Sequence, residues 1–447
     1  MTGNHEYKQD SLDNSPLQKF GKSENDEINV VTGINRIMNT KTTIEKISLH
    51  TEAEYNCCKK EDEIKVKCDG NYSIEQDGNA NSSNNISEYT VQGEVYSCME
   101  PVIYDKNNNN ITVLVTGATG FIASHVVERL LLRGYKVRAT TRSKNNQNSD
   151  ILLDFHFANE NLTLCEAELL NSECWKELVK GCNIVIHCAS PYKMDCSDPY
   201  EIINPAIIGT KNVIHACCMC DDVKTVVLTS SIAAVVGAYK DGKVYSEIDW
   251  NDDCDPLIHP YLYSKVEAEK IAYKVVDECR KSLNLIVVNP GMVIGPSYRN
   301  EINQSVQWIY NMITGRMPLT VDLQTGWVDV RDVAEIHIRL FESGDFSGRF
   351  ICIEGMYTFL DVSRMIKHTS PQFNPPNHCL PTLIAKMVLP LFASKNERDF
   401  LKISLGKRIL LSNGRLLSHF PNYRFLPTFE SVKDTCNDLS NKFDIKK

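Results

Sequence analysis

The chain has 447 residues, 42% hydrophobic and 23% charged, which is an ordinary composition for a globular protein. The first 110 residues carry 19 acidic and 11 basic side chains and the remainder 38 and 37, so nearly all of the net charge of −9 lies in the first quarter. Neither part is basic, which argues against a nucleic-acid partner. No run reaches the roughly 18 consecutive apolar residues of a membrane span. The apolar segment 383–392 is shorter than that and contains Lys386.

The 17 cysteines are scattered, and no secretory signal pattern opens the chain. We therefore expect reduced thiols and a cytoplasmic protein. Cys217 and Cys220 satisfy C-x-x-C, with His215 nearby. A structural zinc site would need a second ligand pair of similar spacing, which the sequence lacks. The sequence predicts no metal.

Residues 1–110 are rich in Asn, Ser and charged side chains, and their apolar residues are sparse. Such a composition cannot offset the entropy of ordering the chain. We predict a disordered, Asn-rich acidic tail over 1–110, a dinucleotide-binding domain over 111–296, and over 297–447 mainly a substrate lobe with segments that return to the sheet.

The first folded unit begins with an apolar run at 111–115, followed by a glycine-rich turn, a helical pattern from residue 121 and a second apolar run at 135–140. The turn reads Gly117-x-x-Gly120-x-x-Ala123. The first glycine permits the tight bend, the second lets the backbone approach a pyrophosphate, and the alanine lets helix and strand pack closely. Together with the helix N-terminus, the turn predicts a dinucleotide site.

The position after the second strand indicates which dinucleotide binds. Sites that prefer NAD usually place an acid there to accept hydrogen bonds from the ribose 2′-hydroxyl. This chain has Arg142 at that position, with Lys144 close behind and no acid before Asp150. Because a guanidinium matches a phosphate in geometry and charge, we expect NADP(H) rather than NAD(H).

Alternating strand and helix patterns continue from there and predict a doubly wound parallel sheet, a Rossmann fold of the α/β class. The third predicted strand ends at Glu168 and the fifth ends at Ser230 and Ser231. Ligands bind at the carboxyl ends of such strands. The predicted strands after the first two are 162–168, 183–188, 225–231, 283–289 and 348–354.

Tyr261 and Lys265 are four residues apart at the start of a predicted helix, and so lie on one helix face. Reduction of a carbonyl develops negative charge on its oxygen and needs a proton donor. A tyrosine near a fixed cation suits that role, because the cation favours the phenolate and lowers the phenol pKa. A serine at the end of the fifth strand would hold the carbonyl oxygen. The pattern alone leaves Ser230 and Ser231 as alternatives.

Several motifs, in this order and spacing, resemble the extended short-chain dehydrogenase/reductase family, also described as NAD-dependent epimerases/dehydratases. Within it the chain is most similar to dihydroflavonol reductases, cinnamoyl-CoA reductases and methylglyoxal reductases. The resemblance covers about residues 111–440. The motifs are VTGATGFIASH from Val115, TSS from Thr229, YLYSK from Tyr261, NPGMVIGP from Asn289 and WVDVRDVA from Trp327.

The resemblance implies an NADPH-dependent reductase of a ketone or aldehyde, with a homodimer as one possible assembly. The sequence differs from the family pattern at two positions. Glu168 stands where the residue that contacts the adenine is usually Asp, and Val236 stands where plant dihydroflavonol reductases often carry a polar residue. The implied catalytic residues are Ser231, Tyr261 and Lys265. The implied cofactor contacts are Gly117, Gly120, Phe121, Ile122, Arg142, Glu168, Ala189, Tyr261, Lys265 and Pro290.

The same fold and catalytic pattern also serve sugar-nucleotide epimerases and dehydratases and 3β-hydroxysteroid dehydrogenases, because a fold does not determine a function. Epimerases typically retain NAD, so Arg142 argues against them. A non-catalytic NADP-binding scaffold is a further alternative. The presence of Ser231, Tyr261 and Lys265 argues against that role.

Overall fold

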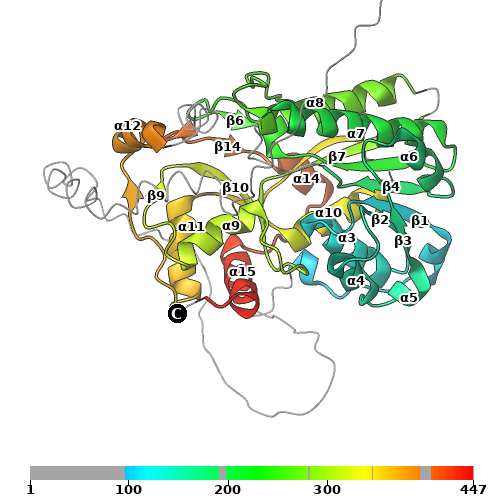
Figure 1. Cartoon of the computed structure of the whole chain (residues 1–447), viewed down its shortest axis with the longest axis horizontal. Helices are drawn as coiled ribbons and strands as arrows, with labels where there is room; N and C mark the ends of the chain where they lie inside the picture. The colour runs from blue at the N-terminus through cyan, green and yellow to red at the C-terminus, as the bar shows by residue number, and fades with distance from the viewer. Residues whose placement is uncertain (1–95, 191–197, 280–281, 345, 393–403, 446–447) are drawn as a thin grey trace, which may run out of the picture.

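The computed structural model describes residues 96–190, 198–279, 282–344, 346–392 and 404–445, with the side chains of 388–392 left out. Helices cover both faces of a central sheet, and a smaller group of helices and strands lies beside one end of it (Figure 1). Residues 1–95 of the tail predicted over 1–110 lie outside the described residues. The fold class predicted from the sequence is confirmed.

The central sheet has seven strands in the order β11-β7-β5-β4-β1-β2-β3, and every neighbouring pair is parallel. The order reverses between β1 and β4, as in doubly wound sheets. The strand predicted over 348–354 does return to this sheet, at the edge beside β7. The strands are β1 (Thr112–Thr116), β2 (Lys136–Thr141), β3 (Leu162–Glu166), β4 (Ile184–His187), β5 (Thr225–Thr229), β7 (Asn284–Pro290) and β11 (Gly348–Cys352).

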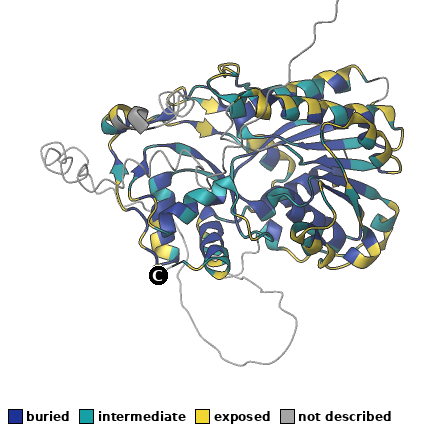
Figure 2. Ribbon diagram, in the orientation of Figure 1, coloured by how far each residue is buried: buried dark blue, intermediate teal, exposed yellow. Residues whose placement is uncertain are grey.

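The two faces of the sheet are covered by different helices. On one face, α3 (Phe121–Leu132) and α10 (Val330–Glu342) pack on each other and share a core with the strands. On the other face lie α6 (Ser172–Leu178), α7 (Tyr200–Met219) and α8 (Pro260–Asp277). Figure 2 shows buried strands between helices that are exposed on their outer sides. Burial on both faces explains why the strands read as continuous apolar runs.

The second group of elements contains a three-stranded sheet in the order β12-β10-β8 and its own apolar core. Its first strand, β8, precedes the predicted boundary at residue 296, whereas α10 and β11 follow that boundary and pack with the central sheet. The division of the chain at residue 296 stays a prediction. The elements of this group are β8 (Met292–Ile294), α9 (Gln304–Ile313), β10 (Gln324–Asp329), β12 (Gly355–Thr358), α11 (Phe359–Thr369) and α15 (Thr428–Lys442).

Short elements connect these parts. The helical ones are η2 (Ser97–Met99), η3 (Lys106–Asn110), α4 (Gln147–Leu153), α5 (Ala158–Asn161), η4 (Ile232–Ala234), α12 (Thr382–Phe392) and α14 (Gly414–His419). The strands are β6 (Val244–Tyr245), β9 (Thr320–Val321), β13 (Cys379–Leu380) and β14 (Leu410–Leu411), which form two further two-stranded sheets, β13-β9 and β14-β6.

Residues 96–110 correct the predicted tail boundary, because they are folded against the rest of the protein. Cys98 is 2% exposed and lies in η2, which packs on α10. Ser97 N donates to Arg424 O at 2.9 Å, and Asn108 Nδ2 donates to Arg133 O at 2.9 Å. The composition of this stretch resembles the tail, but its few buried side chains fit a surface that the local sequence does not reveal.

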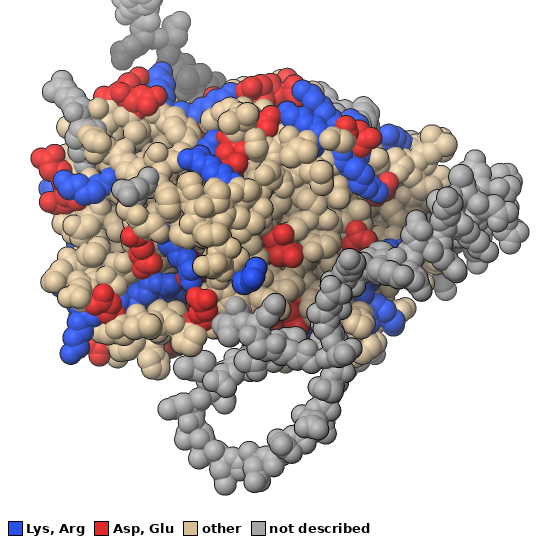
Figure 3. Space-filling model, turned by 180° about the vertical axis from the view of Figure 1, so that it is seen from behind, with Lys and Arg blue, Asp and Glu red and all other residues tan. Residues whose placement is uncertain are grey.

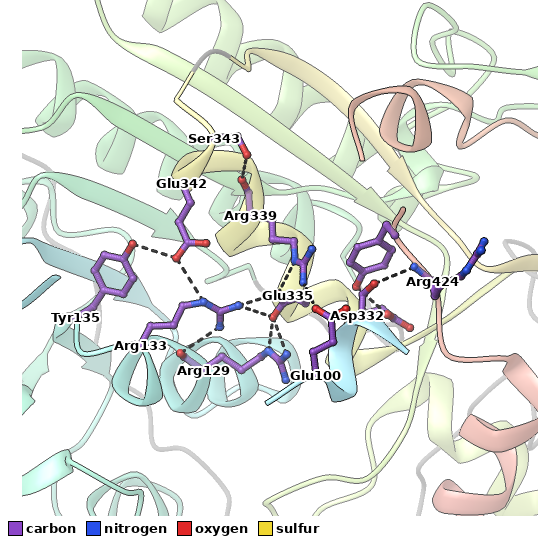
Figure 4. A network of polar contacts seen from close by, with 12 residues as sticks. Glu100, Arg129, Arg133, Tyr135, Asp332, Glu335, Arg339, Glu342, Ser343 and Arg424 are labelled. Atoms are coloured by element: carbon purple, nitrogen blue, oxygen red, sulfur yellow. Dashed lines mark hydrogen bonds and ion pairs between the residues drawn. The ribbon is translucent and has the colours of Figure 1, made fainter. Parts of the chain in front are cut away.

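A buried carboxylate joins the two helices on the α3 face. Glu335 of α10 is 1% exposed and forms ion pairs with three arginines (Figure 4). Arg129 Nη2 lies 2.6 Å, Arg133 Nη2 2.7 Å and Arg339 Nε 2.6 Å from its oxygens. Arg339 also pairs with Glu100, so the network reaches the folded segment before β1. The arginines lower the pKa of Glu335 to about 2 against the opposing effect of burial.

The face opposite that of Figure 1 carries acidic and basic side chains close to one another (Figure 3). Such interspersed charges are typical of a solvated surface. Among the described residues, no helix combines the length and the apolar character needed to cross a bilayer.

We expect a chain that begins at residue 111 to be less stable than one that begins at residue 96. The shorter chain loses the buried Cys98 side chain and uncovers its site on α10, which costs about 2 kcal/mol of unfolding free energy. Urea unfolding of both chains measures the difference. Ile103→Ser in the longer chain is the control, because Ile103 is 84% exposed. Equal midpoints for the two chains would show that 96–110 contribute nothing.

We expect Glu335→Gln to lower the unfolding free energy by about 3–5 kcal/mol near neutral pH, because it leaves buried arginines without their carboxylate. The folded-state pKa of about 2 lies below the ordinary value of 4.5. The stabilisation by Glu335 is therefore complete above about pH 4.5 and is lost as the pH falls toward 2. Urea unfolding between pH 6 and pH 3 should show a smaller pH dependence in the variant. An equal dependence of the unfolding free energy on pH in both proteins would contradict the lowered pKa of Glu335.

Candidate active site

The carboxyl ends of β1 and β4 lie at the point where the strand order reverses. Thr116 ends β1 and is paired with His187, which ends β4. In doubly wound sheets a ligand binds in the crevice at this point. Thr116 Oγ1 contacts His187 Nδ1 at 2.7 Å and accepts a hydrogen bond from Ala189 N at 3.0 Å. These bonds fix the two loops that leave the strands.

The glycine turn has the geometry that its sequence predicts. Gly117 has φ +65°, and a Cβ there would lie 3.0 Å from Ala189 Cα, so a side chain is excluded by both conformation and space. Gly117 N donates to Thr140 Oγ1 at 3.2 Å. Gly120 is the N-cap of α3, and Phe121 and Ile122, both partly buried, form its first turn. The turn therefore places the N-terminus of α3 at the carboxyl end of β1, which fits a pyrophosphate.

Arg142 is exposed and directly follows β2. The loop that contains it is tied to β3, because Glu166 Oε1 accepts a hydrogen bond from Lys144 N at 2.9 Å. Glu168 is exposed and lies beyond β3, which ends two residues earlier than predicted. The guanidinium stands at the end of the strand next to β1, where the adenosine ribose of a dinucleotide lies in this fold.

The two serines after β5 have different surroundings. Ser230 is 8% exposed and donates to Glu269 Oε2 at 2.5 Å. Ser231 is partly exposed, caps η4 and hydrogen-bonds the side chain of Tyr261. Successive residues in extended backbone point to opposite sides, and here Ser231 points toward Tyr261. The geometry therefore favours Ser231 over Ser230 as the serine of the site.

Tyr261 and Lys265 lie in the first turns of α8, which begins at Pro260. Lys265 Nζ is 5.7 Å from the centre of the Tyr261 ring and donates to Ser190 Oγ at 3.1 Å. The structure thus brings Ser231, Tyr261 and Lys265 together. Tyr263 faces a different group of charges, among them Glu267 and Lys270.

The pKa values of the tyrosine and the lysine differ from the simple expectation. Burial raises the pKa of Tyr261 to about 12, although the Ser231 hydrogen bond lowers it. Burial also lowers the pKa of Lys265 to about 8. In this arrangement desolvation dominates both groups.

The remaining predicted cofactor contacts lie at the same edge of the sheet. Ala189 follows β4 and touches the glycine turn, and Pro290 is buried as the last residue of β7. Sequence reasoning missed Ser190, which accepts from Lys265, and Thr140, which holds the glycine turn. The signal for Ser190 was its place directly after a predicted strand end.

The opposite edge of the sheet, at the amino ends of β5, β7 and β11, carries a hollow. This hollow has a volume of about 700 Å³ and is lined by Thr225, Asn284 and Gly348 among others. No group of three His, Cys, Asp or Glu side chains in the described ranges is placed to hold a metal ion. Within those ranges the cysteines form no disulfide.

Comparison with known proteins identifies the sequence pattern more closely. Residues 113–351 match the model of the NAD dependent epimerase/dehydratase family. The chain is 37% identical over 343 residues to a cinnamoyl-CoA reductase of Medicago truncatula, covering 75% of this chain and 98% of that relative. It is 34% identical over 279 residues to a dihydroflavonol 4-reductase of Callistephus chinensis, covering 61% and 76%.

Solved structures show the same similarity. The yeast methylglyoxal/isovaleraldehyde reductase, crystallised with NADPH, superposes with a TM-score of 0.61 and 26% sequence identity, over 74% of this chain and 99% of that chain. Vestitone reductase from alfalfa superposes with a TM-score of 0.58 and 23% identity, over 74% and 98%. The latter similarity concerns the fold alone.

Proposed function

Because the chain belongs to the NAD dependent epimerase/dehydratase family, we propose that it is an NADPH-dependent reductase of a ketone or aldehyde. The observation that carries the proposal is the cluster of Ser231, Tyr261 and Lys265 beside the glycine turn. Each of these side chains has a role in adding a hydride and a proton to a carbonyl group. The relatives named as reductases support the same reaction class.

The residues at the crevice fit a dinucleotide. At Gly117 a Cβ would collide with Ala189, so only glycine lets the turn pack closely against the loop that follows β4. Gly120, Phe121 and Ile122 would hold the pyrophosphate at the N-terminus of α3. Arg142 would bind the 2′-phosphate, which distinguishes NADPH from NADH. Ala189 and Pro290 would flank the nicotinamide, and Glu168 would approach the adenine.

The bound cofactor supplies the hydride, and the protein supplies position and charge. Ser231 donates a hydrogen bond to the carbonyl oxygen and orients it. Tyr261 donates its proton to that oxygen as negative charge develops there. With a pKa of about 12 the phenol retains its proton near neutral pH. Lys265, when protonated, stabilises the phenolate that results.

The relatives limit the substrate to classes rather than to one compound. Their names include reductases of a cinnamoyl thioester, a dihydroflavonol and methylglyoxal. Val236, at the position where a flavonoid reductase often carries a polar residue, is 6% exposed and packs in the apolar core of the second group of elements. We therefore favour an aldehyde over a flavonoid ketone. A homodimer and a cytoplasmic location stay predictions.

The test is oxidation of NADPH, followed by absorbance, with purified protein and a panel of aldehydes, a cinnamoyl thioester and a dihydroflavonol. We expect Tyr261→Phe to lower kcat by about 100-fold or more while NADPH affinity changes little, because only the proton donor is removed. Tyr263→Phe is the matched control and should retain activity. Full activity of Tyr261→Phe would contradict the role of the tyrosine. Binding of NADPH without turnover of any panel member would favour a scaffold.

We expect Arg142→Asp to shift the preference from NADPH toward NADH, because the carboxylate repels the 2′-phosphate and can accept from a 2′-hydroxyl. The ratio of kcat/KM for the two cofactors should change by about 100-fold or more, which corresponds to roughly 3 kcal/mol. Arg364→Asp, an exposed site on α11, is the control. An unchanged ratio would mean that other residues hold the 2′-phosphate.

A further inference from the structure

Glu269 is a buried carboxylate, like Glu335, and lies on α8, the helix that carries Tyr261 and Lys265. It is one helical turn after Lys265 and two turns after Tyr261 on α8. Residues four apart share a helix face, so Glu269 continues the row of side chains that faces the ends of the strands. Glu269 is 1% exposed. A carboxylate this deeply buried is tolerated only when other groups pair with it, because desolvation is costly.

Glu269 contacts three adjacent strands. Its Oε2 accepts from Ser230 Oγ at 2.5 Å and from Asn289 Nδ2 at 2.9 Å. Its Oε1 pairs with Arg349 Nε at 2.5 Å. Ser230 follows β5, Asn289 lies in β7 and Arg349 in β11. The Glu269 carboxylate thus joins α8 to the strands β5, β7 and β11.

Two of these partners hold the turn that presents Ser231. Asn289 Nδ2 also donates to Ser231 O at 3.1 Å, and Arg349 Nη2 donates to Ala234 O at 3.1 Å. Ser231 is the N-cap of η4 and Ala234 is its last residue. The backbone that carries the Ser231 hydroxyl is therefore fixed at both ends by side chains that Glu269 orients.

Arg349 has further partners that fix its own position. Its Nη1 donates to Glu247 O at 3.0 Å and to Asp249 O at 2.5 Å, and its guanidinium lies 4.0 Å from the centre of the Trp250 ring. Arg349 is 5% exposed. Because its other contacts are neutral, Glu269 supplies the negative charge that compensates this buried cation.

We propose that Glu269 is a positioning residue for the carbonyl reduction. Through Asn289 and Arg349 it sets the place of the Ser231 turn relative to the face of α8 that carries Tyr261 and Lys265. The inference rests on the proposed function, because it concerns the geometry of that proposed site. Proton transfer depends steeply on such geometry, and a displacement of about 1 Å can reduce a rate about 100-fold. Glu269 itself touches no substrate.

The test compares Glu269→Gln with Glu335→Gln. The two glutamates are both 1% exposed, both pair with arginine and both lie on helices that cover the sheet. Only Glu269 contacts the Ser231 turn through its partners. Both substitutions should lower Tm, because each leaves buried arginine without its carboxylate. At a temperature well below both Tm values, Glu269→Gln should lower kcat about 10-fold to 100-fold with KM for NADPH and carbonyl nearly unchanged, whereas Glu335→Gln should retain kcat.

Equal kcat values in the two variants, or a loss in Glu269→Gln that appears only in KM, would overturn the proposal and leave Glu269 a stabilising residue. If Glu269→Gln does not fold, Asn289→Ala gives a second test, because it keeps the Glu269 to Arg349 pair and removes the hydrogen bonds that Asn289 makes to Glu269 Oε2 and to Ser231 O. A folded Asn289→Ala protein with wild-type kcat would overturn the proposal as well.

The wild-type protein separates failure of this inference from failure of the proposed function. NADPH binding is measured by calorimetry in the wild type and in each variant, without any carbonyl present. A wild-type protein that reduces no carbonyl refutes the proposed function before the variants are compared. An active wild type with an equally active Glu269→Gln refutes only the positioning role.

Discussion

Burial of both faces of the parallel sheet is the constraint on which the rest of the structure depends. With α3 and α10 on one face and α6, α7 and α8 on the other, the interior of each strand has to be apolar. Most polar side chains of the strands that are covered on both faces lie toward the strand ends, and a buried polar group there needs a partner. Thr116, Ser230 and Asn289 are of this kind, and their hydrogen bonds give the edge of the sheet a defined polar geometry.

The same edge of the sheet also holds two side chains whose charged forms are disfavoured by desolvation. Lys265 and Tyr261 are both desolvated, in ways that oppose their charged forms. A bound dinucleotide would bring phosphates and ribose hydroxyls to this edge, and so would make the surroundings of Lys265 and Tyr261 more polar. The hydrogen bonds around Ser231 fix its backbone in the structure without a ligand. If Ser231 holds the carbonyl oxygen as proposed, its geometry would be in place before the ligand binds, which favours electrostatic stabilisation.

Much of the architecture was predictable because its signals are local. The glycine turn, the apolar strands and the spacing of Tyr261 and Lys265 are each read from fewer than about 20 consecutive residues. The choice between Ser230 and Ser231 was not predictable, since it depends on which side of β5 faces α8. The same holds for Glu269, whose partners lie up to 80 positions away in the sequence. The folded state of 96–110 depends on docking to α10, and composition carries no signal for such docking.

The order in which the chain is made has a consequence for the α3 face. The helix α10, which packs on α3, β5 and β7 and pairs its Glu335 with Arg129 and Arg133, comes about 200 residues after these arginines, with the edge strand β11 later still. Until α10 has been synthesised and has left the ribosome, the apolar surface of α3 that packs on α10 stays exposed to solvent. Long-range closure of this kind slows folding and exposes apolar surface meanwhile. A nascent chain that ends before residue 342 therefore exposes the apolar surface of α3 that α10 buries in the complete fold.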